Sequence, residues 1–113
     1  MENKKVHRGK IDDVWEKIHS SREWGGAYPT EHVIRFVARN YYKRKRKSVK
    51  ILDFGIGGGA HTWYLAREGF DTYGFDGSPS AVKRVQARLA RENLAANIFC
   101  AKGQDVEYKK NFF

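Results

Sequence analysis

A glycine-rich loop restricts the fold of this 113-residue chain more than any other feature. The loop, Gly55-Ile56-Gly57-Gly58-Gly59, follows an apolar run at residues 49–54 that predicts a buried strand. A helical pattern from about residue 60 to residue 68 comes directly after it. Glycine lets the backbone turn tightly and lets a ligand approach where a Cβ would otherwise intervene. Strand, glycine loop and helix in this order predict a ligand site at the carboxyl end of a parallel strand.

Two more strands and a second helix continue the pattern. Residues 71–75 predict a short strand that ends at Asp76, and residues 97–101 predict a third strand. Between them, Ser78 is the predicted helix N-cap, with proline at the first helical position. The order βαβαβ predicts an α/β fold with a Rossmann-like parallel sheet and right-handed crossovers. The residues expected to end the first helix and to form one face of the second are Gly69 and then Val82, Val85 and Leu89.

The first part of the chain has a different, helical pattern. Apolar residues at helical spacing predict one helix over residues 11–19 and another from Thr30, its N-cap, to about Tyr42. Two glycines and a proline interrupt the chain between them. We therefore expect an N-terminal helical segment at residues 1–48, followed by a Rossmann-like domain at residues 49–113. The second helix is expected to bury Val33, Phe36, Val37 and Tyr41.

Positive charge is concentrated in the N-terminal segment. The chain has 22 Lys and Arg against 13 Asp and Glu, a net charge of +9. Residues 1–50 hold 14 basic and 6 acidic side chains, whereas residues 51–113 hold 8 and 7. The densest run predicts either a solvated surface or a patch that contacts the phosphates of a nucleic acid. This run, the basic segment, consists of Lys43, Arg44, Lys45, Arg46 and Lys47.

Several kinds of protein are excluded by composition. A single cysteine, Cys100, leaves no intramolecular disulfide and no cysteine-built metal site, and no metal is expected. We expect Cys100 to be a core thiol because it falls inside a predicted strand, and we expect His61 to pack or face solvent rather than act as a base. No apolar run approaches the roughly 18 residues of a membrane span. The N-terminus has no apolar stretch typical of a secretory signal, so a cytoplasmic protein without membrane contact is expected.

Two acidic residues beside the loop discriminate between two adenosine-type cofactors. Asp76 lies 21 residues after Gly55, where a dinucleotide-binding fold has the acid that binds ribose. An NAD-binding oxidoreductase is therefore one alternative. Asp53, two residues before the loop, would lie beside a pyrophosphate and repel it. A carboxylate there instead favours a ligand that brings an ammonium and a sulfonium to the loop.

The segment from Ile51 to Gly59 resembles the first motif of the class I S-adenosylmethionine-dependent methyltransferases. The segment from Tyr64 to Ser78 resembles the same family through its second strand. The resemblance covers about residues 49–106 and departs at Ile56, where many members have cysteine or another small residue. It implies a methyltransferase that transfers a methyl group from S-adenosyl-L-methionine to an acceptor. The sequence does not identify this acceptor, either a small molecule or a nucleic acid.

The resemblance also implies roles for residues around the loop. Asp53 would approach the methionine amino group through water, and Asp76 would accept both ribose hydroxyls. Asp105, after the third strand, would accept the adenine amino group. Segments before the first strand often fold over the cofactor in this family, so Trp24 and Tyr28 are candidate lid residues. The remaining implied contacts come from Gly55, Gly57 and Gly59 at the methionine end, from Gly77 and Ser78 beside the ribose and adenine, and from the Val106 backbone against the adenine ring.

The family's sheet has seven strands, and this sequence predicts the first three. In the spatial order 3-2-1 the apolar first strand would be an open edge, which invites pairing with another chain. The acceptor site and catalytic residues of the family usually follow the fourth strand. We therefore expect a fragment of a longer protein that is inactive alone, self-associates through its uncovered edge and carries no assignable catalytic residue. The alternatives left open are an NAD-binding oxidoreductase fragment and a basic nucleic-acid-binding module.

Overall fold

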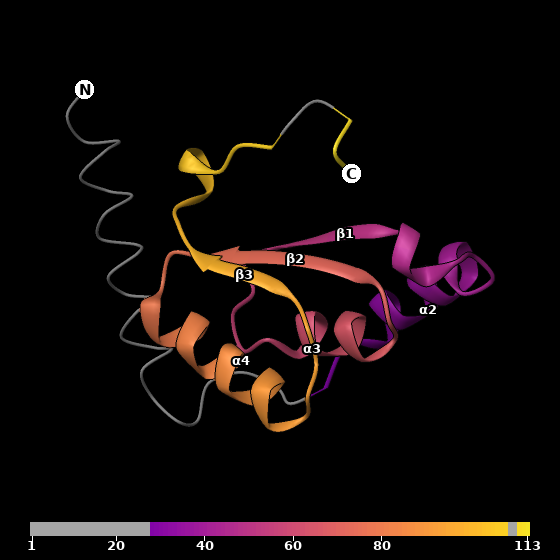
Figure 1. Ribbon diagram of the computed structural model, residues 1–113, viewed down its shortest axis with the longest axis horizontal. Coiled ribbons are helices and arrows are strands. Elements are labelled where there is room, and N and C mark those ends of the chain that lie inside the picture. Colours follow the sequence, from indigo (N-terminus) through magenta and orange to yellow (C-terminus); the bar gives the residue numbers. More distant parts are fainter. Residues whose placement is uncertain (1–27, 109–110) are drawn as a thin grey trace.

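The computed structural model describes residues 28–108 and 111–113, which form a parallel sheet with helices against one face (Figure 1). The strands are β1 (Lys50–Phe54), β2 (Asp71–Asp76) and β3 (Asn97–Cys100). The α-helices are α2 (Glu31–Tyr41), α3 (Ala60–Arg67) and α4 (Pro79–Arg91), and two single turns of 3₁₀-helix are η1 (Arg46–Ser48) and η2 (Gly103–Asp105).

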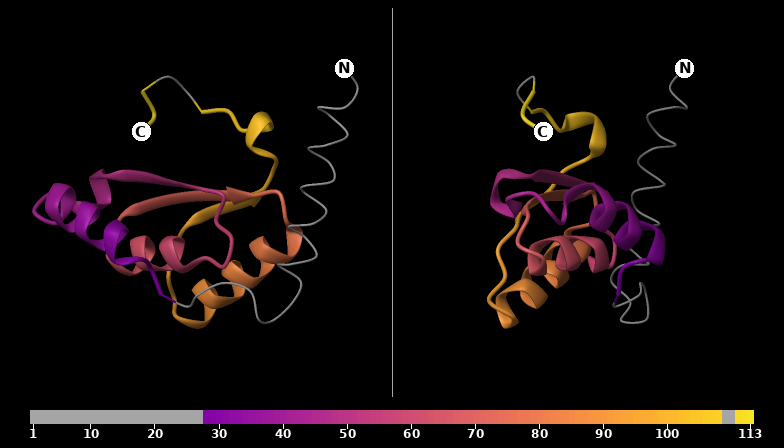
Figure 2. Two further views of the ribbon diagram at one scale, coloured as in Figure 1. Left: turned by 180° about the vertical axis from the view of Figure 1, so that it is seen from behind. Right: turned by 90° about the vertical axis from the view of Figure 1, so that its right-hand side faces the viewer.

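The central strand of this sheet is β2, with β1 on one side and β3 on the other, and both pairings are parallel. The expected Rossmann-like α/β fold and strand order are therefore confirmed. Helices α3 and α4 lie on one face of the sheet, and the segment after η2 lies on the opposite side (Figure 2). The glycine loop follows the carboxyl end of β1, whereas the basic segment precedes its amino end. The two features thus lie at opposite ends of the sheet.

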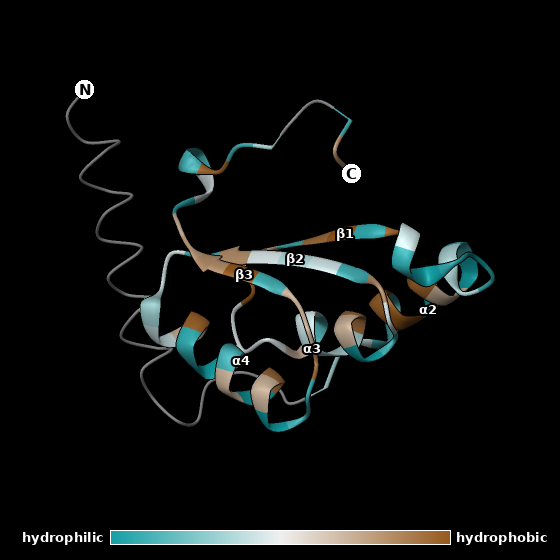
Figure 3. Cartoon of the chain, in the orientation of Figure 1, coloured by the Kyte–Doolittle hydropathy of each residue, from teal (hydrophilic) through white to brown (hydrophobic). Residues whose placement is uncertain are grey.

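Apolar side chains from the helices fill the space under the sheet in two groups. The first centres on Phe70, which is 2% exposed, and joins α2 to α3. The second joins α3 to α4, whose apolar and polar residues alternate along the helix (Figure 3). Each large side chain buried in this way stabilises the fold by about 1.5–3 kcal/mol. The buried members are Val37, Val49, Trp63, Tyr64, Leu65 and Phe70 in the first group and Ile56, Ala66, Val82, Val85 and Leu89 in the second.

The helix ends follow the expected signals. The Ser78 hydroxyl accepts a hydrogen bond from the Ala81 N–H (3.2 Å), which caps α4 in front of the proline. After α3, Gly69 adopts a φ of +90°, and the next N–H, of Phe70, donates to the Leu65 carbonyl (3.1 Å). A left-handed residue with this backward bond is the glycine-based helix end that the sequence indicates.

Three burial expectations are wrong, those of Phe36, Cys100 and Phe54, and all three residues lie on edge elements. The side chain of Phe36 on α2 is 60% exposed and lines a cavity of about 470 Å³ beside β1. In the described residues β1 pairs only with β2, so no further strand covers this side of α2. Cys100 is exposed because it ends β3, the other edge strand. The expected helix at residues 11–19 and Trp24 lie outside the described residues.

None of the helices in the described part of the chain has the length and apolarity of a membrane span.

Candidate functional site

The glycine loop turns the chain sharply from β1 into α3. The N–H groups of Gly55 and Ile56 both donate to the carbonyl of Phe75 on β2, at 3.1 and 3.0 Å. Gly55, Gly57 and Gly59 have φ values of +74°, +52° and +84°, in the region that residues with a Cβ rarely adopt. The loop therefore needs glycine at these three positions for backbone conformation, whatever else it does. The N-terminus of α3, with its unpaired first N–H groups, faces the same edge of the sheet.

Gly55 and Gly59 differ in what surrounds them. A Cβ added at Gly55 would meet no atom within 4 Å, so its backbone borders open space. A Cβ at Gly59 would come within 2.3 Å of the Val85 side chain on α4. Gly59 is buried and allows α3 and α4 to approach each other closely. A ligand can approach the loop at Gly55, whereas Gly59 is needed for packing.

Asp76, at the end of β2, connects the loop to the start of α4. One carboxylate oxygen, Oδ2, accepts from the Gly57 N–H, and the other, Oδ1, accepts from the Ser78 N–H, both at 2.9 Å. A carboxylate has about four acceptor positions, so each oxygen retains capacity for a further donor. The side chain is only partly buried, which leaves that capacity accessible.

Asp53 lies one strand away, near the carboxyl end of β1. Its Oδ2 accepts a hydrogen bond from the hydroxyl of Thr62 (2.7 Å), a residue of α3 that is 0% exposed. Burial raises the pKa of Asp53 above its usual value, and the nearby carboxylate of Asp76 adds to the rise. The hydrogen bonds from Thr62 and the proximity of His61 oppose the rise. A cationic group bound here would offset the free-energy cost of burying this carboxylate in its charged form.

The other residues expected at the site lie around this edge. Ser78 is buried and its hydroxyl caps α4, so its side chain has a structural partner. Gly77 precedes it and is partly buried. Asp105 is exposed at the end of η2, and Val106 follows it, partly buried. The η2 turn reaches the sheet edge because Gly103 packs against the ring of Phe54 at the end of β1.

Tyr28, the lid candidate that lies in the described residues, is 74% exposed and contacts the ring of Trp63 on α3 edge-on, with centroids 5.9 Å apart. Its contact is with the helix after the loop, on the helical side of the sheet. The second lid candidate, Trp24, is outside the described residues.

Two residues near the site were missed from the sequence. Thr62 holds the Asp53 carboxylate, and its position in the first turn after the glycine loop is the signal that could have indicated it. Phe54 is 71% exposed at the end of β1 and meets Phe75 edge-on (centroids 4.7 Å apart). Its apolar character in a strand predicted burial, and it is exposed because β1 is an edge strand.

The basic segment has one structural member and four exposed ones. The guanidinium of Arg46 stacks over the Tyr42 ring at 4.4 Å and donates to the Glu68 carbonyl oxygen at 2.9 Å. It therefore belongs to the packing between α2 and α3. The other four form no ion pair with an acidic side chain in residues 28–108 or 111–113. These four exposed cations are Lys43, Arg44, Lys45 and Lys47.

The charge at the glycine-loop edge distinguishes between two adenosine cofactors, S-adenosylmethionine and a dinucleotide. Two carboxylates, Asp53 and Asp76, lie beside the loop, and burial already disfavours the charged form of the first. A pyrophosphate would add negative charge between them, whereas an amino acid ammonium and a sulfonium would offset it. The residues present therefore fit S-adenosylmethionine and do not fit a dinucleotide. A parallel sheet with two carboxylates beside a glycine loop is therefore the arrangement expected of a class I methyltransferase.

Comparison with known proteins gives the same class. Residues 51–113, more than half of the chain, match the family model described as a methyltransferase domain. The chain belongs to this family of class I S-adenosylmethionine-dependent methyltransferases, and S-adenosyl-L-methionine is its cofactor. The nicotinamide alternative is set aside.

Individual relatives are similar to more of the chain than residues 51–113, which the family model covers. The tRNA (uracil(54)-C(5))-methyltransferase of Pyrococcus abyssi is 28% identical over 107 residues, which are 94% of this chain and 25% of the relative. The chain thus spans about a quarter of that relative's length. A solved structure of the Pyrococcus abyssi tRNA (uracil-54, C5)-methyltransferase with S-adenosyl-L-homocysteine is 25% identical, with a TM-score of 0.57, over 77% of this chain and 22% of that chain.

A second solved structure, from work on the conversion of a disulfide bond into a thioacetal group during echinomycin biosynthesis, has a TM-score of 0.70. It is 19% identical and covers 81% of this chain and 39% of that chain, so it shows the fold alone.

Proposed function

We propose that this chain carries the cofactor-binding part of an S-adenosylmethionine-dependent methyltransferase, with its cofactor site at the carboxyl edge of the sheet. The observation that carries the proposal is the pair of carboxylates, Asp53 and Asp76, on either side of a glycine loop whose first residue borders open space. An arrangement of this kind suits a ligand with a cationic end and a hydroxyl-bearing ribose.

Each residue has a proposed part in holding the cofactor. Asp53 approaches the methionine ammonium through water, and Thr62 keeps that carboxylate oriented through its 2.7 Å hydrogen bond. Asp76 accepts the ribose hydroxyls with the capacity that its two backbone bonds leave free. Asp105 and the Val106 backbone receive the adenine. The loop and its flank, Gly55, Gly57, Gly59, Gly77 and Ser78, shape the floor, and Tyr28 and Trp24 are the proposed lid.

S-adenosylmethionine supplies an electrophilic methyl carbon on a sulfonium. The contribution of this chain's residues is to bind and orient, because correct alignment of reactants is itself a large catalytic factor. No residue is assigned as a general base.

We further propose that the acceptor belongs to a nucleic acid, contacted through the basic segment. Residues 32–52 contain eight Lys and Arg and no Asp or Glu. Four cations of the basic segment are exposed and have no ion-pair partner in the described residues. Phosphate contacts of this type release counterions on binding. The similarity to a tRNA methyltransferase supports RNA as the acceptor.

The cofactor proposal is tested by calorimetric titration with S-adenosylhomocysteine, with NAD as the control ligand. We expect binding of the first and none of the second. The Asp76→Ala variant should lose the binding. The matched control is Asp71→Ala, on the same strand but at its amino end, where the carboxylate pairs with Lys50 at 3.2 Å. Retention of affinity in Asp76→Ala, or equal loss in both variants, would contradict the assignment.

The nucleic-acid proposal is tested by the salt dependence of RNA binding. For a single strand, log K falls with log salt by about 0.7 per neutralised phosphate. Replacing the four exposed cations by glutamine should therefore reduce the slope by up to about 3. A variant with the same number of glutamines at Lys83, Arg84, Arg91 and Lys102 is the matched control for net charge. Equal slopes in the two variants would show that the basic segment has no special part.

A further inference from the structure

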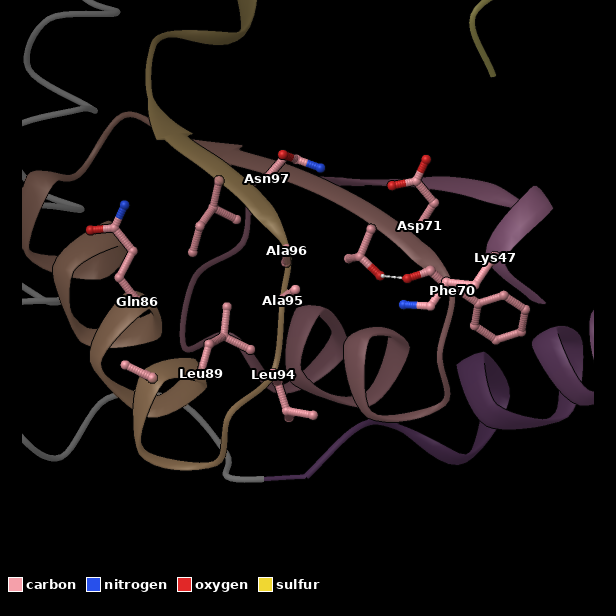
Figure 4. Close-up of a pocket in the computed structure, with 12 residues that line it drawn as sticks. Lys47, Phe70, Asp71, Gln86, Leu89, Leu94, Ala95, Ala96 and Asn97 are labelled. Atoms are coloured by element: carbon pink, nitrogen blue, oxygen red, sulfur yellow. Dashed lines mark hydrogen bonds between the residues drawn. The ribbon is translucent and has the colours of Figure 1, made fainter.

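A cavity of about 370 Å³ lies at the amino ends of β2 and β3, under the C-terminal half of α4 (Figure 4). Its volume falls within the about 300–1,000 Å³ of small-molecule sites. The glycine loop and its carboxylates are at the opposite end of the strands, about 17 Å away by the rise of the five residues of β1. The cavity is therefore separate from the proposed cofactor site.

The lining of the cavity combines an apolar floor with one amide group on the same side of the sheet. Leu89 and Leu94 contribute apolar surface, and the small Ala90 leaves room for a ligand. Gln86 on α4 carries an amide on the same side of the sheet as Leu89. Asn97, at the start of β3, also borders the cavity, but its side chain lies on the opposite side of the strand from Ile98, which packs against Leu89 (Figure 4). The Gln86 amide forms no hydrogen bond within residues 28–108 and 111–113. It offers one acceptor and two donors to a ligand.

Charge around the cavity favours an anionic partner. Lys47, the last residue of the basic segment, contributes to the lining, so the exposed cations continue to its rim. Asp71 also lines it, but the Lys50 ammonium pairs with that carboxylate at 3.2 Å and the Tyr73 hydroxyl donates to it at 3.2 Å. The local carboxylate is thus compensated, while Lys47 is not.

We propose that this cavity binds an unpaired base of an RNA strand whose phosphates lie on the basic segment. An exposed base is recognised through its edges by amide donors and acceptors, and its flat faces suit an apolar floor. The RNA occupant presupposes the nucleic-acid acceptor proposed above. A strand that contacts this cavity and also reaches the cofactor edge covers about 17 Å. The cavity would hold the RNA at a point remote from the methylated position.

Base recognition and phosphate attraction are separated by two probes. The probes are a fluorescein-labelled single-stranded RNA of about twelve nucleotides, long enough for both edges, and an abasic ribose-phosphate chain of the same length. We expect the wild-type chain to bind the RNA at least tenfold more tightly than the abasic chain. In Gln86→Ala this ratio should fall toward one while the salt slope stays unchanged, because Gln86 is exposed and uncharged; Asn97→Ala, which removes an exposed amide on the opposite side of β3, should leave the ratio unchanged. Equal binding of the two probes by the wild-type chain would overturn the proposal.

A charge-matched pair of variants gives a second test. Ala90 and Ala87 are both exposed on α4, and only Ala90 lines the cavity. Ala90→Glu should weaken RNA binding at least tenfold more than Ala87→Glu, although both change the net charge equally. Equal effects of the two substitutions would argue against the cavity.

Titration of the same samples with S-adenosylhomocysteine distinguishes the two proposals. Cofactor binding without discrimination between RNA and the abasic chain would overturn the base cavity and leave the proposed cofactor site intact. Discrimination between the probes without cofactor binding would overturn the proposed cofactor site and leave the base cavity intact.

Discussion

The close approach of Gly59 to Val85 allows backbone strain and packing to be measured apart. Gly59→Ala adds a methyl group 2.3 Å from a Val85 side-chain carbon, at a φ of +84°. The left-handed conformation costs a residue with a Cβ about 1–2 kcal/mol. Overpacking of a well-packed core adds about 1–3 kcal/mol. The expected loss in the free energy of unfolding is therefore about 2–5 kcal/mol.

Gly55→Ala is the matched control because its φ is +74° but its Cβ would meet nothing within 4 Å. It should lose only the conformational part, about 1–2 kcal/mol. Its affinity for S-adenosylhomocysteine should fall, since the added methyl group points into the proposed cofactor space. Urea unfolding followed by circular dichroism measures both free energies under one set of conditions.

Removal of the clashing atoms provides the decisive comparison. In Gly59→Ala/Val85→Ala the two nearest carbons are removed and only the Cβ of residue 85 remains, 3.2 Å from the added methyl group, so the double variant should be about 1–3 kcal/mol more stable than the sum of the single losses indicates. Additive losses, or equal losses in Gly59→Ala and Gly55→Ala within about 0.5 kcal/mol, would refute the reasoning.

Three further predictions follow from the carboxylate at the end of β1 and from the free strand edge. Asp53→Asn removes a carboxylate whose pKa is raised by burial, so the variant should be more stable than wild type at neutral pH, while its affinity for S-adenosylhomocysteine falls. Because the folded chain holds this proton more tightly than the unfolded chain, the stability gap should shrink as pH falls through the raised pKa toward about 4; urea unfolding at several pH values measures it, and a gap independent of pH would contradict the cause. Thr62→Val leaves the Asp53 carboxylate without its 2.7 Å bond, so the Asp53 pKa should rise further and stability fall by about 1–3 kcal/mol. An NMR titration of the Asp53 carboxyl follows this pKa, and Thr72→Val, which removes another buried hydroxyl, should leave it unmoved. In the described residues one edge of β1 pairs with no strand, which predicts self-association of the chain, and a monodisperse monomer in light scattering would contradict it.

The regular elements could be predicted because their signals are local. The helix expected at residues 60–68 occupies Ala60–Arg67, and Ser78 caps α4 as its hydroxyl and the following proline indicate. Parallel pairing followed from the alternation of strand and helix patterns, whereas the strand order was what the family resemblance implied. None of these inferences required knowledge of a distant contact.

The burial of a side chain could not be predicted from the sequence where it depends on whether another element covers the edge of the sheet. The helical period correctly gave Val37 as buried on α2, but Phe36 is exposed because no strand pairs with β1 on that side in the described residues. Cys100 has the strand character that suggested a core thiol, yet it ends an edge strand. Likewise, the bond between Asp53 and Thr62 joins a strand to a helix, and only the fold brings them within 2.7 Å.

The two backbone bonds of Asp76 have a thermodynamic consequence for any ligand at this edge. Both carboxylate oxygens are oriented before a ligand arrives, one by the loop and one by the start of α4. A side chain that binding must immobilise costs about 0.5–1.5 kcal/mol, and Asp76 avoids that cost. The same rigidity means that a lengthened side chain, as in Asp76→Glu, must displace the loop or the helix start before it can meet the same hydroxyls. The tolerance of position 76 to substitution therefore depends on its hydrogen bonds to the Gly57 and Ser78 backbone as much as on the ligand it would bind.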